Sequence, residues 1–159
     1  MVSKEVEKLL LKVQKPGRYV GGELNEVIKD KKKVDCRFAF CFPDTYEVGM
    51  SHLGMKILYS LMNAVPYIWC ERVFAPWVDM EEEMIKHNIP LYALESGDPV
   101  SDFDFIGFTL QYELSFTNML NMLRLSGVPI KSCDRKELKN IVVCLLYTSP
   151  SPRDTERSR

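Results

Sequence analysis

The chain has 159 residues, of which 46% are hydrophobic and 27% charged, with 21 basic and 22 acidic side chains. This length and apolar content are typical of one soluble globular domain, which can bury about two-thirds of its unfolded surface. The nearly neutral charge argues against nucleic-acid binding, which needs a basic face, and no apolar stretch is long enough to span a bilayer. Because the polar N-terminus also lacks a secretory apolar region, we expect a cytoplasmic protein with no nucleic-acid or membrane partner.

The first 35 residues are predicted to form an N-terminal helix and a glycine-rich lead-in. Val6, Leu9, Leu10 and Val13 recur at helical spacing within residues 3–14, and the glycines and proline of residues 15–23 end this pattern. The glycine spacing fits neither a dinucleotide-binding loop nor a P-loop. A structured lead-in loop is therefore favoured over a phosphate cradle.

Residues 36–110 alternate strand and helix patterns. An apolar strand at 36–42 precedes Asp44 and Glu47, which together are typical of a capping box. The helix that follows is predicted to carry one apolar face, made of Met50, Leu53, Ile57, Leu58 and Leu61. Further elements are predicted within 67–74 (strand), at 78–87 (helix), at 91–94 (short strand) and within 103–110 (strand).

A helix at about 113–126 and a strand at 141–143 complete the pattern. Repeated strand–helix alternation predicts a three-layer α/β fold in which helices cover both faces of a parallel sheet. Ligands of such sheets bind beyond the carboxyl ends of the strands. Residues 43–47, 74–79 and 109–115 are therefore the loops where we expect a binding site.

The last segment, residues 144–159, resembles the in-frame translation of a sequencing adapter, through the run CLLYTSPSPRD. Its Ser, Pro and Arg content is also typical of a disordered tail. On the adapter interpretation the natural sequence stops near Val143, and the α/β domain of residues 36–143 is truncated at its C-terminal edge. We therefore expect a fragment of a longer protein, followed by a non-native tail.

Five blocks in chain order carry a family resemblance: PGRYVGGE (16–23), FPDTYEVGMSHLG (42–54), ERVFAPWVDME (71–81), LES (94–96) and FTLQYELSFTN (108–118). They resemble the N-terminal region of a family of large radical SAM proteins with a cobalamin-binding-like domain. The resemblance implies a flavodoxin-like α/β domain placed before a radical SAM barrel. That barrel would hold a [4Fe–4S] cluster on a C-x-x-x-C-x-x-C motif and cleave S-adenosylmethionine.

No such cysteine motif occurs in these residues, so no catalytic residue is expected here, and the barrel of the parent protein is the expected partner. The five cysteines, at 36, 41, 70, 133 and 144, lack C-x-x-C spacing. They predict free, largely buried thiols rather than a metal site.

The resemblance also suggests cobalamin as a cofactor. Related domains ligate cobalt through the histidine of D-x-H-x-x-G, of which this chain keeps only His52 and, one position early, Gly54. The candidate cofactor-binding residues are Asp44, Tyr46, His52, Gly54, Trp77, Gln111 and Tyr112. Most have a plainer alternative, because His52 can be structural, Asp44 can cap a helix, and Trp77, Gln111 and Tyr112 can pack against a neighbouring domain.

Three functions follow from these patterns. The first is the N-terminal module of a radical SAM protein that binds cobalamin or organises the access of a small-molecule substrate. The second is a docking scaffold that binds no corrin, as the incomplete histidine motif suggests. The third, a small flavin carrier, is least favoured because only Thr45 follows the first strand as a hydroxyl for a phosphate.

Overall fold

A computed structural model describes residues 4–135 and 138–146. The helices are α1 (Lys4–Leu10), α2 (Tyr46–Ser51), α3 (Leu53–Ala64), α4 (Val78–His87) and α5 (Ser115–Leu125). The strands are β1 (Cys36–Phe42), β2 (Ile68–Phe74), β3 (Phe105–Leu110) and β4 (Ile141–Leu146). Short 3₁₀ turns lie at Pro16–Arg18, Val100–Asp102 and Ser132–Arg135.

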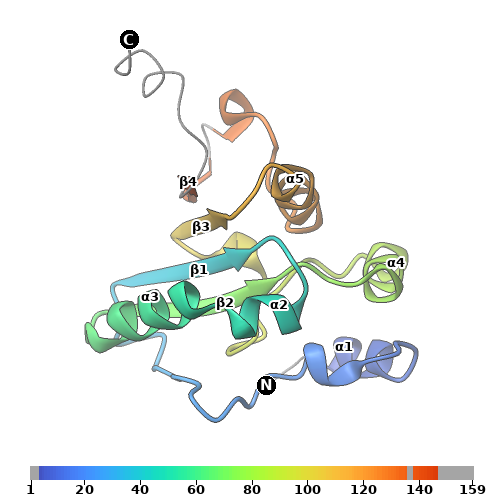
Figure 1. The fold of residues 1–159 in the computed structure, drawn as a ribbon, viewed down its shortest axis with the longest axis horizontal. Coiled ribbons are helices and arrows are strands. Elements are labelled where there is room, and N and C mark those ends of the chain that lie inside the picture. The colour runs from blue at the N-terminus through green and yellow to red at the C-terminus, as the bar shows by residue number, and fades with distance from the viewer. Residues whose placement is uncertain (1–3, 136–137, 147–159) are drawn as a thin grey trace.

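The described strands form one parallel sheet in the order β2-β1-β3-β4 (Figure 1). β1 and β3 lie inside it, which explains their continuous apolar sequences, since an inner strand of a parallel sheet is covered on both faces. The predicted three-layer α/β fold is confirmed. The strand order matches the first four strands of the flavodoxin-like order, in which the chain changes direction across the sheet between β1 and β3.

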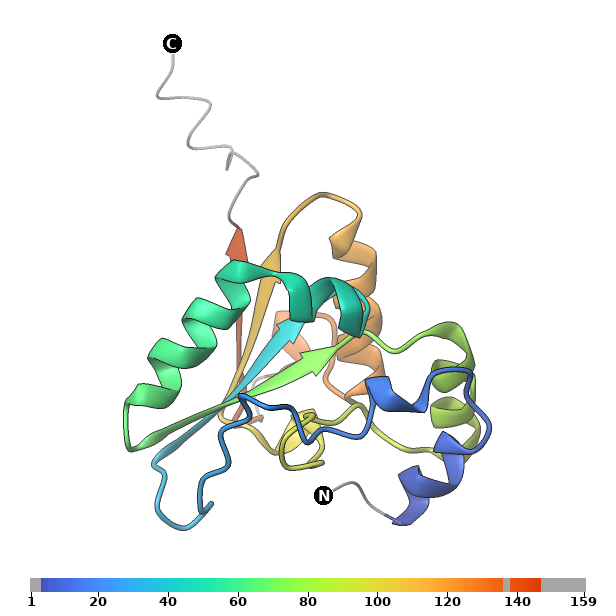
Figure 2. The same cartoon turned by 60° about the horizontal axis from the view of Figure 1, so that its bottom comes forward.

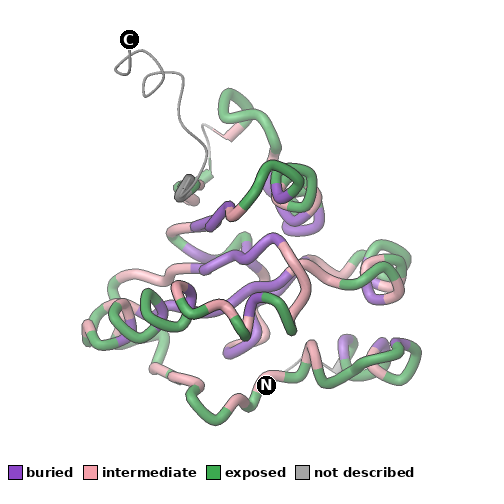
Figure 3. Tube along the Cα trace, viewed as in Figure 1, coloured by how far each residue is buried: buried purple, intermediate pink, exposed green. Residues whose placement is uncertain are grey.

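Helices cover both faces of the sheet, as Figure 2 shows with α2 and α3 on one side and α4 and α5 on the other. The larger core is formed by residues of α1, α4 and α5 packed against the sheet. In the smaller core, Met55 and Tyr59 of α3 pack against Phe40 and Cys70 of the sheet. Burial is accordingly greatest along the strands (Figure 3). The helical face predicted for the N-terminal segment is confirmed for Val6 and Leu9, which belong to the larger core, but the helix ends at Leu10, and Val13 joins the same core from the turn that follows.

The helix predicted after β1 is interrupted at His52, which separates α2 from α3. α3 buries Met55, Tyr59 and Asn63. The apolar face predicted for the core is wrong: Leu53, Ile57, Leu58 and Leu61 are 69%, 50%, 39% and 61% exposed. The interruption changes the rotation of the second helix about its axis, so that a different set of residues faces the sheet.

The predicted capping box is also absent. α2 begins after Thr45, whose side chain makes no capping hydrogen bond. Asp44 Oδ1 accepts instead from the backbone N–H of Thr45 at 2.7 Å, while Glu47 pairs with Arg18 at 2.8 Å. The Glu47 carboxylate binds the Arg18 guanidinium and not a backbone N–H at the start of the helix, because a charged donor forms the stronger hydrogen bond.

Residues 91–94, predicted as a strand, form only an isolated antiparallel bridge between Tyr92 and Pro99. This segment covers the outer edge of β2. The Leu94 N–H donates to the Arg72 carbonyl at 2.9 Å, and the Asn63 side chain bonds both the N–H and the carbonyl of Cys70. The edge is thus closed by a loop and an amide instead of a further strand.

β4 continues to Leu146, past the predicted end of the strand at Val143, in parallel register with Phe105–Leu110. Backbone pairing needs no particular side chain, so the strand can extend as far as β3 does. Residues 147–159 of the predicted tail lie outside the described residues. Within the described part, no helix is long and apolar enough to cross a membrane.

Candidate functional site

A cleft of about 200 Å³ lies at the carboxyl ends of β1 and β3, where the strand order reverses. Four of the predicted site residues line it: Asp44, His52, Gln111 and Tyr112. Phe42, Pro43, Val48, Thr109 and Ser115 complete the wall. The fold therefore brings together polar residues from two loops that are more than sixty residues apart in the sequence.

Asp44 and Tyr112 join the two sides of the cleft. The Tyr112 hydroxyl donates to Asp44 Oδ2 at 2.9 Å, and this hydrogen bond to a carboxylate raises the pKa of Tyr112 above its ordinary value. Nearby, the Asn118 side chain of α5 donates to the Pro43 carbonyl at 3.0 Å, and the Gln111 amide donates to Thr109 Oγ1 at 2.7 Å. These bonds hold the loops after β1 and β3 in one arrangement.

His52 stands between α2 and α3 and caps α3. Its Nδ1 accepts from the backbone N–H of Met55 at 3.2 Å, and its ring lies 5.3 Å from that of Phe42. Gly54 leaves room for the ring, since a Cβ at position 54 would lie 3.0 Å from His52 Cε1. The predicted structural alternative for His52 thus has a specific basis in N-terminal capping.

The same hydrogen bond determines which nitrogen of His52 carries the proton, and so whether the ring can bind a metal. A backbone N–H only donates, so Nδ1 must carry a lone pair, and the proton of the neutral imidazole is then on Nε2. Metal-ligating histidines have the opposite arrangement, in which the second nitrogen donates its proton to a neighbouring acceptor. His52 therefore does not fit as the axial ligand of a cobalamin.

Tyr46 and Trp77 lie away from the cleft and contact the N-terminal lead-in. The Tyr46 hydroxyl donates to Glu23, and burial together with this carboxylate raises the pKa of Tyr46 to about 12. Trp77 lies under the Arg18 guanidinium at 5.4 Å from the ring centroid. In this structure both side chains fasten residues 16–23 to the domain.

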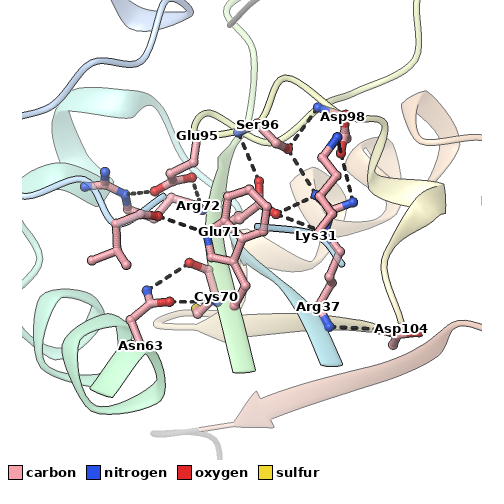
Figure 4. Close-up of polar contacts among 12 residues, drawn as sticks. Lys31, Arg37, Asn63, Cys70, Glu71, Arg72, Glu95, Ser96, Asp98 and Asp104 are labelled. Carbon is pink, nitrogen blue, oxygen red and sulfur yellow. Dashed lines mark hydrogen bonds and ion pairs between the residues drawn. The ribbon is translucent and has the colours of Figure 1, made fainter. Parts of the chain in front are cut away.

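Sequence reasoning missed two buried ion pairs on β2, which Figure 4 shows on either side of the strand. Arg72 Nε donates to Glu95 at 2.6 Å, and Arg37 donates to Glu71 at 2.5 Å. Burial raises the pKa of both carboxyl groups, against the opposing effect of their arginines. The available signal was the charged dipeptide Glu71-Arg72 inside an otherwise apolar strand.

All five cysteines are free thiols, but the prediction that they are largely buried holds for only two of them. Cys41 and Cys70 are buried and free, whereas Cys133 and Cys144 are exposed. Across residues 4–135 and 138–146, no three His, Cys, Asp or Glu side chains gather in a way that could hold a metal ion.

In a comparison with protein families, the family model of the N-terminal region of radical SAM proteins matches residues 54–152, more than half of the chain. The chain belongs to this family. The matched part of the radical SAM N-terminal module runs from α3 through β4 and includes Gln111 and Tyr112. No match is found among the curated proteins or the solved structures.

Proposed function

We propose that this radical SAM N-terminal module binds a small polar ligand at the β1/β3 cleft and so organises substrate access to the radical SAM domain of its parent protein. The observation that supports the proposal best is the Asp44–Tyr112 hydrogen bond, which joins the two loops at the strand-order reversal. His52 and Gln111 line the same cleft. Ligands of open α/β sheets bind at this position.

The size of the cleft limits what it can enclose. At about 200 Å³ it is smaller than the roughly 300–1,000 Å³ of pockets that bury a whole drug-sized ligand. It suits one end of a molecule, with the Asp44 carboxylate accepting from a donor group of the ligand. The exposed ring of Tyr112 offers a flat surface beside it.

A corrin at this cleft would bind without imidazole ligation by His52. Titration of the full-length parent protein with hydroxocobalamin, followed by desalting, tests this directly. Retained corrin with unchanged visible bands supports binding without histidine, while a histidine-ligated spectrum that His52→Ala abolishes contradicts the assignment of His52 as a cap. Loss of all corrin on the desalting column argues against corrin binding. The cleft would then take a smaller ligand, or the module would act as the docking scaffold.

A docking scaffold is the second candidate, favoured by the exposed apolar side of α3. Leu53 and Leu61 are 69% and 61% exposed, and contiguous apolar surface of this kind is typical of interaction sites. Hydrogen–deuterium exchange on the full-length protein and on the present chain distinguishes the two functions. Protection of α3 only in the full-length protein supports docking, and equal exchange in both argues against it.

A further inference from the structure

A cavity of about 580 Å³ lies away from the β1/β3 cleft and shares no lining residue with it. It opens to solvent and lies between the lead-in around residues 23–27 and the helices α2 and α3, which lie above that segment in Figure 1. Its volume is within the range of pockets that enclose small molecules. Val27, Met55 and Ala64 supply apolar wall, and Leu24, which is 98% exposed, lies at the rim.

The wall formed by the lead-in is fastened at several points. Val27 accepts from Trp69 Nε1 at its carbonyl and donates from its N–H to the Tyr59 hydroxyl, each at 2.9 Å. Lys29 Nζ donates to the carbonyls of Asn63 and Val65 at the end of α3, at 2.8 and 2.7 Å. The cavity is therefore a built part of the fold, not a gap beside a loose segment.

Arg72 lines this cavity with a guanidinium whose hydrogen-bonding capacity is only partly used. Its side chain is 7% exposed, and Nε is occupied by Glu95. Nη1 donates to the Met50 sulfur at 3.3 Å, a weak acceptor, and the buried Nη2 has no partner among the described residues. Nη1 and Nη2 together form the planar fork that binds a carboxylate through two parallel bonds.

Met50 is the side chain that an incoming acceptor would displace. It lines the cavity, and its thioether contacts Nη1. Methionine is unbranched and adapts easily to a new rotamer, so it can leave the fork at small cost. An acceptor entering from the cavity would thereby gain both nitrogens.

The charges around the cavity nearly balance, so they disfavour a doubly charged anion more than a singly charged one. Arg72 is already balanced by Glu95, and Lys56 adds one cation. Glu23 adds an anion that would repel a phosphate dianion more strongly than a carboxylate. The apolar walls require a hydrocarbon part in the same molecule.

We propose that this cavity binds a small carboxylic acid with an apolar body, its carboxylate held by Nη1 and Nη2 of Arg72. The site is independent of the function proposed for the β1/β3 cleft. It gives the lead-in of this chain a role in ligand binding.

Isothermal titration of the 159-residue chain tests the proposal with three probes: sodium octanoate, 1-octanol and sodium phosphate. Octanoate is expected to bind saturably at one site, and the other two are expected to bind at least tenfold more weakly. Equal binding of octanol would overturn the role of Arg72, and equal binding of phosphate would overturn the choice of a carboxylate with an apolar body.

Two neighbouring positions of α3 supply matched variants. Ser60 lines the cavity, whereas the exposed Leu61 does not. Ser60→Trp is expected to weaken octanoate binding at least tenfold, and Leu61→Trp to leave it unchanged. Octanoate binding that survives Ser60→Trp, or that Leu61→Trp abolishes equally, would place the ligand elsewhere and refute the proposal.

The arginine itself is tested by removing both charges of the buried pair in an Arg72→Gln/Glu95→Gln variant. Circular dichroism shows first whether this variant is folded. Folded protein is expected to lose octanoate binding, and retained binding would contradict the proposal. The Ser60 and Leu61 variants decide the question if the double variant does not fold.

Discussion

The hydroxyl of Tyr112 lies 2.9 Å from Asp44 Oδ2, although 68 residues separate the two in the chain. The contact joins the loop after β1 to the loop after β3, so it reports on whether the two sides of the cleft are assembled. Tyr112→Phe and Asp44→Asn, singly and combined, form a double-mutant cycle.

We expect a coupling free energy of about 1 kcal/mol from urea unfolding of these variants, as for a partly exposed hydrogen bond. Tyr67→Phe is the control, because Tyr67 is exposed and its hydroxyl makes no hydrogen bond within the described part of the chain. Additive effects of Tyr112→Phe and Asp44→Asn would show that the two side chains do not interact in solution.

The same pair predicts a pH dependence. The hydrogen bond to Asp44 raises the folded-state pKa of Tyr112 above its ordinary value of 10.0. Its stabilisation is therefore fully present below pH 10.0 and is lost as the pH rises through the folded-state pKa. Phenolate absorbance, measured as the difference between the wild type and Tyr112→Phe, should titrate at lower pH after Asp44→Asn. An unchanged midpoint would contradict the assignment.

His52 should behave as a helix cap. His52→Ala removes the acceptor for the Met55 N–H and is expected to cost about 1 kcal/mol of unfolding free energy, while His52→Asn should recover most of it. His87→Ala, on the exposed end of α4, is the control. Nitrogen NMR shifts of the wild type should show the proton on Nε2, and a proton on Nδ1 would refute the cap.

The ion pair between Arg72 and Glu95 predicts a large loss of stability when one partner is removed. Glu95 is nearly fully buried, so Glu95→Gln leaves the guanidinium charge unpaired inside the protein and should cost about 3–5 kcal/mol. Glu82→Gln, on the exposed side of α4, should change the free energy of unfolding by no more than about 0.5 kcal/mol. Similar effects of the two variants in urea unfolding would show that burial of Glu95 is not maintained.

Gly49 is required by close packing. A Cβ there would lie 2.3 Å from Phe74 Cε1 and 3.1 Å from Phe42 Cδ1, and the Phe74 ring is itself packed against Tyr46. Gly49→Ala is therefore expected to destabilise the fold by about 1–3 kcal/mol, even though alanine favours a helix. Gly17→Ala, with no atom within 4 Å, serves as the control in thermal unfolding. Stabilisation by Gly49→Ala would contradict the packing.

The sequence predicts the order of strands and helices well, because hydrophobic periodicity is a local property. The apolar stretches at β1 and β3 and the helical spacing of Val6, Leu9 and Val13 each mark an element without reference to the rest of the chain. The loops after β1 and β3 follow from the parallel sheet, which puts the carboxyl ends of its strands at one edge. Four of the seven predicted site residues consequently line one cleft.

The outward side of α3 could not be predicted in this way. Leu53, Ile57 and Leu61 fit an apolar face as well as Met55 and Tyr59 do, and only the interruption at His52 selects which set meets the sheet. At the interruption His52 has an extended backbone and its ring accepts a hydrogen bond from the Met55 N–H, and periodicity encodes neither feature.

The sequence by itself therefore determined the α/β class, the position of the strand-end loops and the family resemblance, all of which rest on residue order and local pattern. Only the tertiary structure decided which charges are buried. Arg72 pairs with Glu95, which is 23 residues away in the sequence, and Arg37 pairs with Glu71, which is 34 residues away. A charge is stable inside a protein only where the fold supplies its partner, and that partner is fixed by packing in three dimensions.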